Sequence, residues 1–215
     1  MNSSFLGTIL PMLFDGLKLT LLISIVGILI GFVIGSICGY LLQSDHPIGK
    51  TIASVYIWIM RATPLMVQAL YGYYVIPKLL GIDLPSTTVG IMVIALNSGA
   101  FMSEIVRGAL AGIDPGQKEA GVCLGLTDVQ VMFNIIVPQA FKVALPGLFN
   151  QFIISVKDTA LLSVIAVNEI THQAQAYAAL SFKAIPTYTA LAAFYLVFLS
   201  LLILLQRFVE RKVGK

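Results

Sequence analysis

Charged side chains are scarce in this chain. Asp, Glu, Lys and Arg together make up 11% of its 215 residues, whereas a soluble domain carries about 25%. Hydrophobic residues make up 58%, and the mean hydropathy is +0.95. So few charges cannot cover the surface of a water-soluble globular protein, which excludes that class. The composition predicts an all-helical integral membrane protein.

Cysteine and histidine are also rare, with two of each in the chain. Cys38 lies in a long apolar run and Cys123 in a polar loop, so no disulfide framework is expected. His46 and His172 lie in different loops, and neither has a Cys or His neighbour at the spacing of metal ligands. We therefore expect no metal site in this chain.

A nucleotide site is not expected either. Gly49-Lys50-Thr51 matches the end of a phosphate-binding loop, but Ser44 replaces the first glycine of that motif and no strand precedes it. The sequence also has no internal repeat and no low-complexity segment. We therefore expect a single transmembrane domain over residues 1–215, with no nucleic-acid partner and no cofactor of its own.

Long apolar runs are what the chain has in abundance. A membrane helix needs about 20 apolar residues. Three runs of that length carry no charge: Leu19–Ser44, Leu84–Ser103 and Ala184–Gln206.

Two further apolar regions are each interrupted by charge. Arg61 divides Thr51–Pro77, and Lys157 with Asp158 divides Val143–Asn168. Together with the three uninterrupted runs, these regions predict five transmembrane helices.

Basic residues in the loops predict the orientation, because cytoplasmic loops carry an excess of Lys and Arg. With the N-terminus outside, the inner side receives nine of these bases: Lys50, Arg61, Arg107, Lys118, Lys142, Arg207, Arg211, Lys212 and Lys215. The outer side receives three: Lys18, Lys78 and Lys183. We therefore expect a multi-pass protein of the cytoplasmic membrane, with its C-terminus in the cytoplasm.

Placing Arg61 inside affects the second span. Thr51–Met60 is then expected to lie along the inner interface, with the span itself starting near Pro64. Tyr56 and Trp58 suit such an interfacial position.

The cytoplasmic loop, at about residues 108–141, is expected to be structured. Asp114 followed by Pro115 is a helix-start signal, and Gln117 lies where a capping box has its Glu or Gln. Thr127 and Gln130 repeat the capping-box spacing for a second helix. The loop therefore predicts a short helix, a turn near residue 126, and another helix that runs towards the membrane.

Gly121 and Gly125 are four residues apart, which places them on one face if the helix continues through both. A face without side chains lets another surface come close to the backbone. Two interpretations remain open: the face contacts another protein, or the glycines serve packing within the chain, with Gly125 ending the helix.

The same loop contains a longer pattern. It runs through Glu119, Ala120, Gly121, Gly125, Ile135, Val137 and Pro138. This pattern resembles the signature loop of the permeases of ATP-binding cassette (ABC) importers, which reads Glu-Ala-Ala, three residues, Gly, nine residues, Ile, one residue, Leu-Pro. Gly121 and Val137 depart from it.

Other stretches resemble the branch of that family that takes up polar amino acids such as His, Arg, Gln and Glu. They are Arg61–Leu65, Leu96–Ala100, Ser103–Gly108, Pro115–Gln117 and Lys157–Leu161. In the family, Ser is common where Ala160 stands here. The resemblance covers the chain from Leu17 to Glu210.

The resemblance implies the permease subunit of a type I ABC importer, not an enzyme. Glu119, Ala120, Gly121 and Gly125 would belong to a coupling helix that docks on an ATPase. The implied partners are two cytoplasmic ATPase subunits, a second permease copy or close homologue, an external solute-binding protein, the amino acid and membrane lipid. ATP and magnesium would bind to the ATPase. The substrate is expected to be a polar amino acid, and Glu104 and Asp158 could supply the negative charge that a basic amino acid would need.

Polar residues within the spans are candidates for the substrate pathway, because intramembrane polar groups are costly and usually face a cavity or a partner. Glu104, with Asn97 and Ser98 about two turns earlier, belongs to this group. An alternative is that Glu104 only forms an ion pair with Arg107, three residues later.

Three other intramembrane polar residues are pathway candidates. Gln68 is an amide within the second span, and Lys157 and Asp158 interrupt the fourth. The two charged residues could contact the carboxylate and amine of an amino acid, or form structural pairs between helices.

Two other classes of protein fit part of this pattern. A secondary transporter or channel driven by an ion gradient would account for the intramembrane charges, but not for the capped cytoplasmic helix pair. A membrane-embedded enzyme would need a nucleophile with a base, or metal ligands, within the spans, and none of the apolar runs contains a His.

Overall fold

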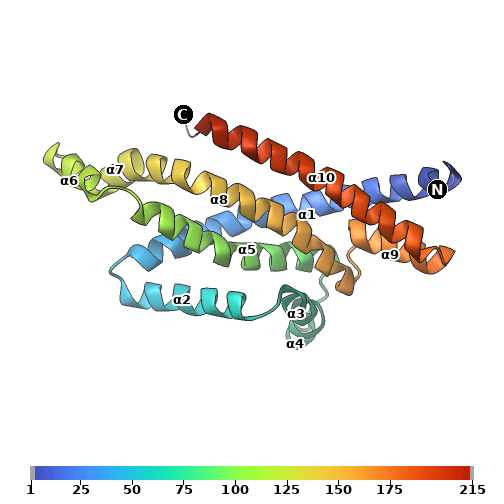
Figure 1. Cartoon of the computed structure of the whole chain (residues 1–215). Helices are drawn as coiled ribbons and strands as arrows, with labels where there is room; N and C mark the ends of the chain where they lie inside the picture. The colour runs from blue at the N-terminus through green and yellow to red at the C-terminus, as the bar shows by residue number, and fades with distance from the viewer. Residues whose placement is uncertain (1–2, 214–215) are drawn as a thin grey trace.

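The computed structural model describes residues 3–213, which are entirely helical or in turns and loops (Figure 1). The α-helices are α1 (Ser3–Gln43), α2 (Pro47–Ala62), α3 (Leu65–Leu70), α4 (Ile76–Leu80), α5 (Ser86–Ala111), α6 (Pro115–Cys123), α7 (Asp128–Val131), α8 (Val137–Asp158), α9 (Ile170–Ser181) and α10 (Ala184–Val213). Two π-helical turns, η1 (Tyr71–Val75) and η2 (Met132–Ile136), and a 3₁₀ segment, η3 (Thr159–Ile165), connect some of them.

Four segments of the described chain are long and apolar enough to cross a membrane: Phe5–Gln43, Ser86–Ala111, Asp128–Ile165 and Ala184–Lys212. A fifth span arises if α2 and Leu65–Leu80, which meet at a bend of 104°, count as one. The prediction of five spans holds in that sense. α1 begins well before the apolar run that predicted it. Asp15 and Lys18, which precede that run, lie inside the helix and form an ion pair of 2.7 Å.

The prediction that Thr51–Met60 lies along the inner interface is wrong. The segment belongs to α2, which packs against α1 and α5 and buries Ala53 and Ile57. The Tyr56 hydroxyl donates to the carbonyl of Leu96, inside α5, at 2.6 Å.

Arg61 does not lie in a loop, although the count of inner bases assumed that it did. Arg61 lies in the last turn of α2, whereas Lys50 lies near its start. Along a helix that rises 1.5 Å per residue, the two are about 16 Å apart. The remaining inner bases still outnumber the outer ones.

Pro64 divides α2 from α3, because the residue before a proline is pushed towards extended backbone. Thr63 is extended, with φ −112° and ψ 136°. The Gln68 side chain spans the break and donates to the carbonyls of Met60 and Thr63 at 2.9 and 3.0 Å. The predicted start of the second span near Pro64 is therefore wrong if α2 and Leu65–Leu80 form one span, because Pro64 then marks a break inside that span.

Both π-helical turns end two residues before a proline. η1 precedes Pro77, and η2 precedes Pro138. A proline inside a helix removes one backbone donor and crowds the carbonyl four residues earlier. Local widening to a π turn relieves this crowding while the helix continues.

A row of glycines joins α1 to α5. Gly27, Gly31, Gly35 and Gly39 recur every four residues, so they lie along one face of α1. A methyl group added at any of them would come within 3.0 Å of an atom of α5. The backbones of these two helices are therefore in close contact along most of α5.

The loop over about residues 108–141 has the predicted helix starts. Asp114 accepts from the Gly116 N–H at 2.8 Å, and Thr127 forms the predicted capping box with Gln130. The capping box predicted at Gln117 is absent, because its side-chain oxygen accepts instead from Gln139 Nε2 at 3.3 Å. That contact joins α6 to α8.

The fourth apolar region does not stay α-helical throughout. α8 ends at Asp158, the chain tightens into η3, and Ala166 takes a left-handed conformation with φ 56°. The short helix α9 then lies against α1 and α10, at the end of the molecule opposite α6 (Figure 1).

Candidate functional site

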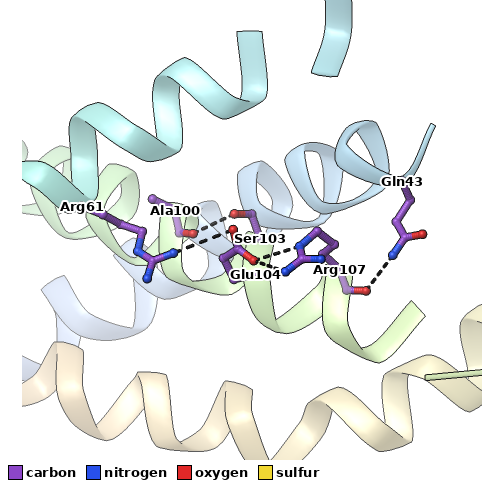
Figure 2. A network of polar contacts seen from close by, with 6 residues as sticks. All are labelled: Gln43, Arg61, Ala100, Ser103, Glu104 and Arg107. Atoms are coloured by element: carbon purple, nitrogen blue, oxygen red, sulfur yellow. Dashed lines mark hydrogen bonds and ion pairs between the residues drawn. The ribbon is translucent and has the colours of Figure 1, made fainter. Parts of the chain in front are cut away.

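Glu104 lies on α5 between two arginines (Figure 2). Its Oε2 accepts from Arg107 Nε at 2.9 Å and lies 2.8 Å from Arg107 Nη2. Its Oε1 lies 3.8 Å from Arg61 Nη1. The predicted pairing with Arg107 is confirmed, and the link to Arg61 on α2 was not expected.

The surroundings hold this cluster in place (Figure 2). The Arg61 guanidinium lies over the Phe101 ring, 5.6 Å from its centroid. The Gln43 amide at the end of α1 donates to the Arg107 carbonyl at 3.0 Å. A hollow of about 460 Å³ opens beside Arg61 and Glu104. Three helices therefore meet at a charged, partly open site.

The charges of this cluster are only partly shielded from solvent. The Glu104 side chain is 33% exposed, and those of Arg61 and Arg107 are 49% and 46% exposed. Pairs this exposed contribute little to stability, of the order of 1 kcal/mol or less. Replacing these ion pairs by pairs with the carboxylate and ammonium groups of a ligand would therefore cost little free energy.

Asn97 and Gln68, two separately proposed pathway candidates, lie in contact with each other. Asn97 Nδ2 donates to Gln68 Oε1 at 3.1 Å, so the amide that spans the break in the second span also reaches α5. Ser98 is separated from them, because it is buried against Gly31 of α1.

Lys157 and Asp158 lie at the end of α8, exposed and half-buried respectively. Within residues 3–213, neither side chain makes a hydrogen bond or an ion pair with another group of the chain. The interpretation that they form structural pairs between helices therefore finds no support in this structure.

The four coupling candidates separate into two pairs. Glu119 and Ala120 are exposed on α6. Gly121 is buried, and a methyl group there would lie 2.7 Å from Val131 Cγ2. Gly121 therefore serves packing within the chain.

Gly125 does not share a helix face with Gly121, and the interpretation that it ends the helix is confirmed. Gly125 lies beyond the end of α6 with φ 80°. The N–H of Leu126 donates to the Gly121 carbonyl, and the N–H of Gly125 to the Val122 carbonyl. These two bonds form the Schellman motif that ends many helices, in which glycine is favoured because it has no Cβ.

Glu169 is a buried carboxylate that sequence reasoning missed. It is fully buried at the start of α9, where its oxygens accept from the N–H groups of Thr171 and His172, both at 2.7 Å. The Tyr195 hydroxyl of α10 lies 3.4 Å away. Burial raises the pKa of Glu169 to about 7, although these hydrogen bonds lower it. The sequence feature that could have identified Glu169 is its position as an acidic residue directly after the fourth apolar region.

Relatives of known family resemble this chain over nearly its full length. A family model described as binding-protein-dependent transport system inner membrane component matches residues 27–215. The glutamine transport system permease protein GlnP of Escherichia coli (strain K12) is 38% identical over 205 residues, which are 95% of this chain and 94% of that protein. The arginine transport system permease protein ArtQ of Bacillus subtilis (strain 168) is 32% identical over 99% of this chain and 98% of that protein.

Solved structures share the fold. A crystal structure of an amino acid ABC transporter with histidines contains a chain that is 33% identical, with a TM-score of 0.89 over 99% of both chains. A chain of the inward-facing MetNI methionine ABC transporter is 19% identical, with a TM-score of 0.83 over the whole of both chains, and supports the fold alone. The chain belongs to the family of binding-protein-dependent transport system inner membrane components: it is a membrane-spanning permease subunit of an ABC importer, a kind of subunit that works with a separate ATPase and a binding protein.

Proposed function

We propose that this subunit carries polar amino acids across the cytoplasmic membrane, and that the cluster around Glu104 lines their pathway. The observation that carries the proposal is a carboxylate held between Arg61 and Arg107 beside an open hollow. An amino acid brings one carboxylate and one ammonium, which are the partners that these groups need. The named relatives, which transport glutamine and arginine, support the same substrate class.

The charge balance of the cluster bears on the choice of amino acid. Glu104 and Asp158 were the reasons for expecting a basic substrate. Two guanidinium groups now offset the charge of Glu104. The cluster therefore favours binding of the main-chain carboxylate that all amino acids share, and leaves recognition of the side chain to other groups.

The other pathway candidates divide by their positions. The Gln68–Asn97 amide pair and Asp158 stay in the proposed pathway, because each has polar atoms left to contact a ligand. Lys157 stays with them as an exposed cation near the end of α8. Ser98 is withdrawn, since its side chain is buried between α5 and α1.

The assembly that we propose contains two permease chains, either two copies of this one or this one and a close homologue. Two ATPase subunits bind at the cytoplasmic end and hold the ATP and magnesium, and a solute-binding protein docks outside. The N-terminus lies outside and the C-terminus inside, which puts α6 on the cytoplasmic side. Glu119 and Ala120, exposed on α6, face the ATPase.

Replacing Glu104 tests the pathway. In the assembled transporter, Glu104→Gln should reduce ATP-driven amino-acid uptake at least tenfold, because the amide cannot pair with an ammonium group. Basal ATP hydrolysis and copurification of the ATPase should stay at the wild-type level. Glu210→Gln is the matched control: it alters a contact with Gln206 at the end of α10 and should leave uptake unchanged.

A different pattern would refute the pathway assignment. If Glu104→Gln reduced uptake, basal hydrolysis and recovery of the complex in parallel, the cluster would serve only to hold α2 against α5.

A further inference from the structure

An apolar groove of about 870 Å³ runs along the half of the molecule nearest α6. One wall is α1, where Ile37 and Tyr40 are more than half exposed, and the other is formed by α7, η2 and α8. Phe133, on η2, is 67% exposed into this region. In a chain that spans a membrane, an open apolar surface of this size lies against lipid or against another protein chain.

The length of the groove matches one leaflet of a bilayer. Its lining along α1 extends from Phe32 to Leu41, a rise of about 14 Å at 1.5 Å per residue. The hydrocarbon core of a bilayer is about 30 Å thick, so one leaflet is about half of that. In the proposed orientation, this is the inner leaflet.

The groove has a polar mouth of mixed charge. Lys118 of α6 and Asp128 of α7 both line it at its cytoplasmic end. Among the described residues, neither side chain has a hydrogen-bond or ion-pair partner within the chain. A free cation and a free anion at one site complement a ligand that carries both a phosphate and an ammonium group.

We propose that the groove is a binding site for one phospholipid of the inner leaflet whose headgroup joins a phosphate to an ammonium, as in phosphatidylethanolamine. An acyl chain lies between α1 and α8, Lys118 binds the phosphate, and Asp128 binds the ammonium. The site places a lipid beside the proposed coupling helix α6. The proposal rests on the orientation given under the proposed function, which makes this end cytoplasmic.

Filling the groove tests the acyl-chain site. The assembled transporter, washed in detergent without added lipid, is assayed by mass spectrometry for phosphatidylethanolamine retained per permease. Ile37→Trp, which places a bulky ring in the groove, should lower retention at least fivefold. Val33→Trp is the matched control, since Val33 lies about one turn earlier on α1, is 58% exposed, and lies outside the groove. Equal retention in both variants, or no retained lipid in the wild type, would overturn the proposal.

The headgroup is tested by competition in bilayers that contain phosphatidylethanolamine and phosphatidylglycerol. Lys118→Gln should weaken retention of phosphatidylethanolamine at least threefold, whereas Lys142→Gln, the same charge change outside the groove, should not. Asp128→Asn should reduce the preference for phosphatidylethanolamine over phosphatidylglycerol, which lacks the ammonium. An unchanged preference in Asp128→Asn would overturn the headgroup assignment.

A protein occupant gives a different result. In a background without Cys38 and Cys123, Phe133→Cys crosslinked to the ATPase or to a second permease chain would overturn the lipid assignment.

The lipid and transport assays are separate measurements. Retention lost in Ile37→Trp but kept in Val33→Trp, together with no amino-acid uptake by the wild type, would support the lipid site and contradict the proposed function.

Discussion

Glu169 lies fully buried at the start of α9 and holds a proton more tightly than an exposed glutamate does. Its pKa is about 7 in the fold, against an ordinary value of 4.5. Between these pH values the folded protein binds more protons than the unfolded chain, so stability falls as pH rises through this window. The stabilisation is present in full below about pH 4.5 and is lost above about pH 7.

Replacing Glu169 with a residue that does not ionise should reduce the pH dependence of the Tm. We expect the wild-type Tm to fall by roughly 5 °C between pH 5 and pH 8, given about 2–4 °C per kcal/mol for a chain of this size. Glu169→Gln keeps an oxygen acceptor for the start of α9 and cannot ionise, so its Tm should change less over the same range. Thermal unfolding in detergent measures this, with the exposed Glu119→Gln as control. Parallel pH profiles for wild type and Glu169→Gln would refute the assignment.

Gly125 ends α6 in a left-handed conformation, which makes a specific prediction about substitutions. A side chain in that conformation costs about 1–2 kcal/mol, except for Asn, which tolerates it. A methyl group would meet no atom within 4 Å, so the cost comes from the backbone and not from crowding. Gly125→Ala and Gly125→Leu should lower thermal stability to a similar degree, and Gly125→Asn should be accepted.

Gly108 provides the control for Gly125. It lies inside α5 with a negative φ, and a methyl group there would also meet nothing. Gly108→Ala should therefore be neutral or stabilising, by up to about 1 kcal/mol. If Gly125→Leu unfolded normally but failed to copurify with the ATPase, Gly125 would instead contact that partner directly.

At the scale of elements, the contact between α1 and α5 depends on the glycine row. A methyl group at Gly35 would lie 2.8 Å from the Gly99 carbonyl oxygen and from Met102 Cβ. Gly35→Leu should therefore force the helices apart and destabilise the protein by about 1–3 kcal/mol, the usual cost of overpacking. Gly7→Leu, on the same helix, meets nothing within 4 Å of its Cβ and should have little effect. Thermal unfolding of the two variants compares them, and equal losses would contradict the close packing.

The long helices could be predicted from the sequence because apolar runs of spanning length have few alternatives in a bilayer. The position of α2 could not be predicted, because a charged residue such as Arg61 is expected in a loop when no partner is known. Its partner is Glu104, which lies on another helix. Gly125 shows a similar limit. The same spacing fits a helix face or a helix end, and only the backbone conformation distinguishes them.

The candidate site was also only partly predictable. The pairing of Glu104 with Arg107 follows from helix geometry, since the two are three residues apart. The contact between Asn97 and Gln68 joins two spans, and pairings between helices depend on how the helices pack. Glu169 was missed because its burial comes from α1 and α10, which are distant in the sequence.

At the scale of the whole molecule, the proposed functions occupy different places along the long axis. The α6 segment and α9 lie at opposite ends (Figure 1), and the Glu104 cluster lies on α5 between them. Because α1 and α5 pack closely, we expect these two helices to move as one body. A movement imposed on α6 would reach the Glu104 cluster through α5, which precedes α6 directly in the chain.

The central claim is that this permease moves polar amino acids only when its partner ATPase is supplied with ATP. The direct measurement is uptake of labelled amino acids into vesicles that contain the assembled transporter, with the solute-binding protein outside and ATP inside. We expect uptake of at least one polar amino acid, and loss of that uptake when ATP is omitted or replaced by a non-hydrolysable analogue. Uptake that continued without ATP and followed an imposed ion gradient would contradict the account.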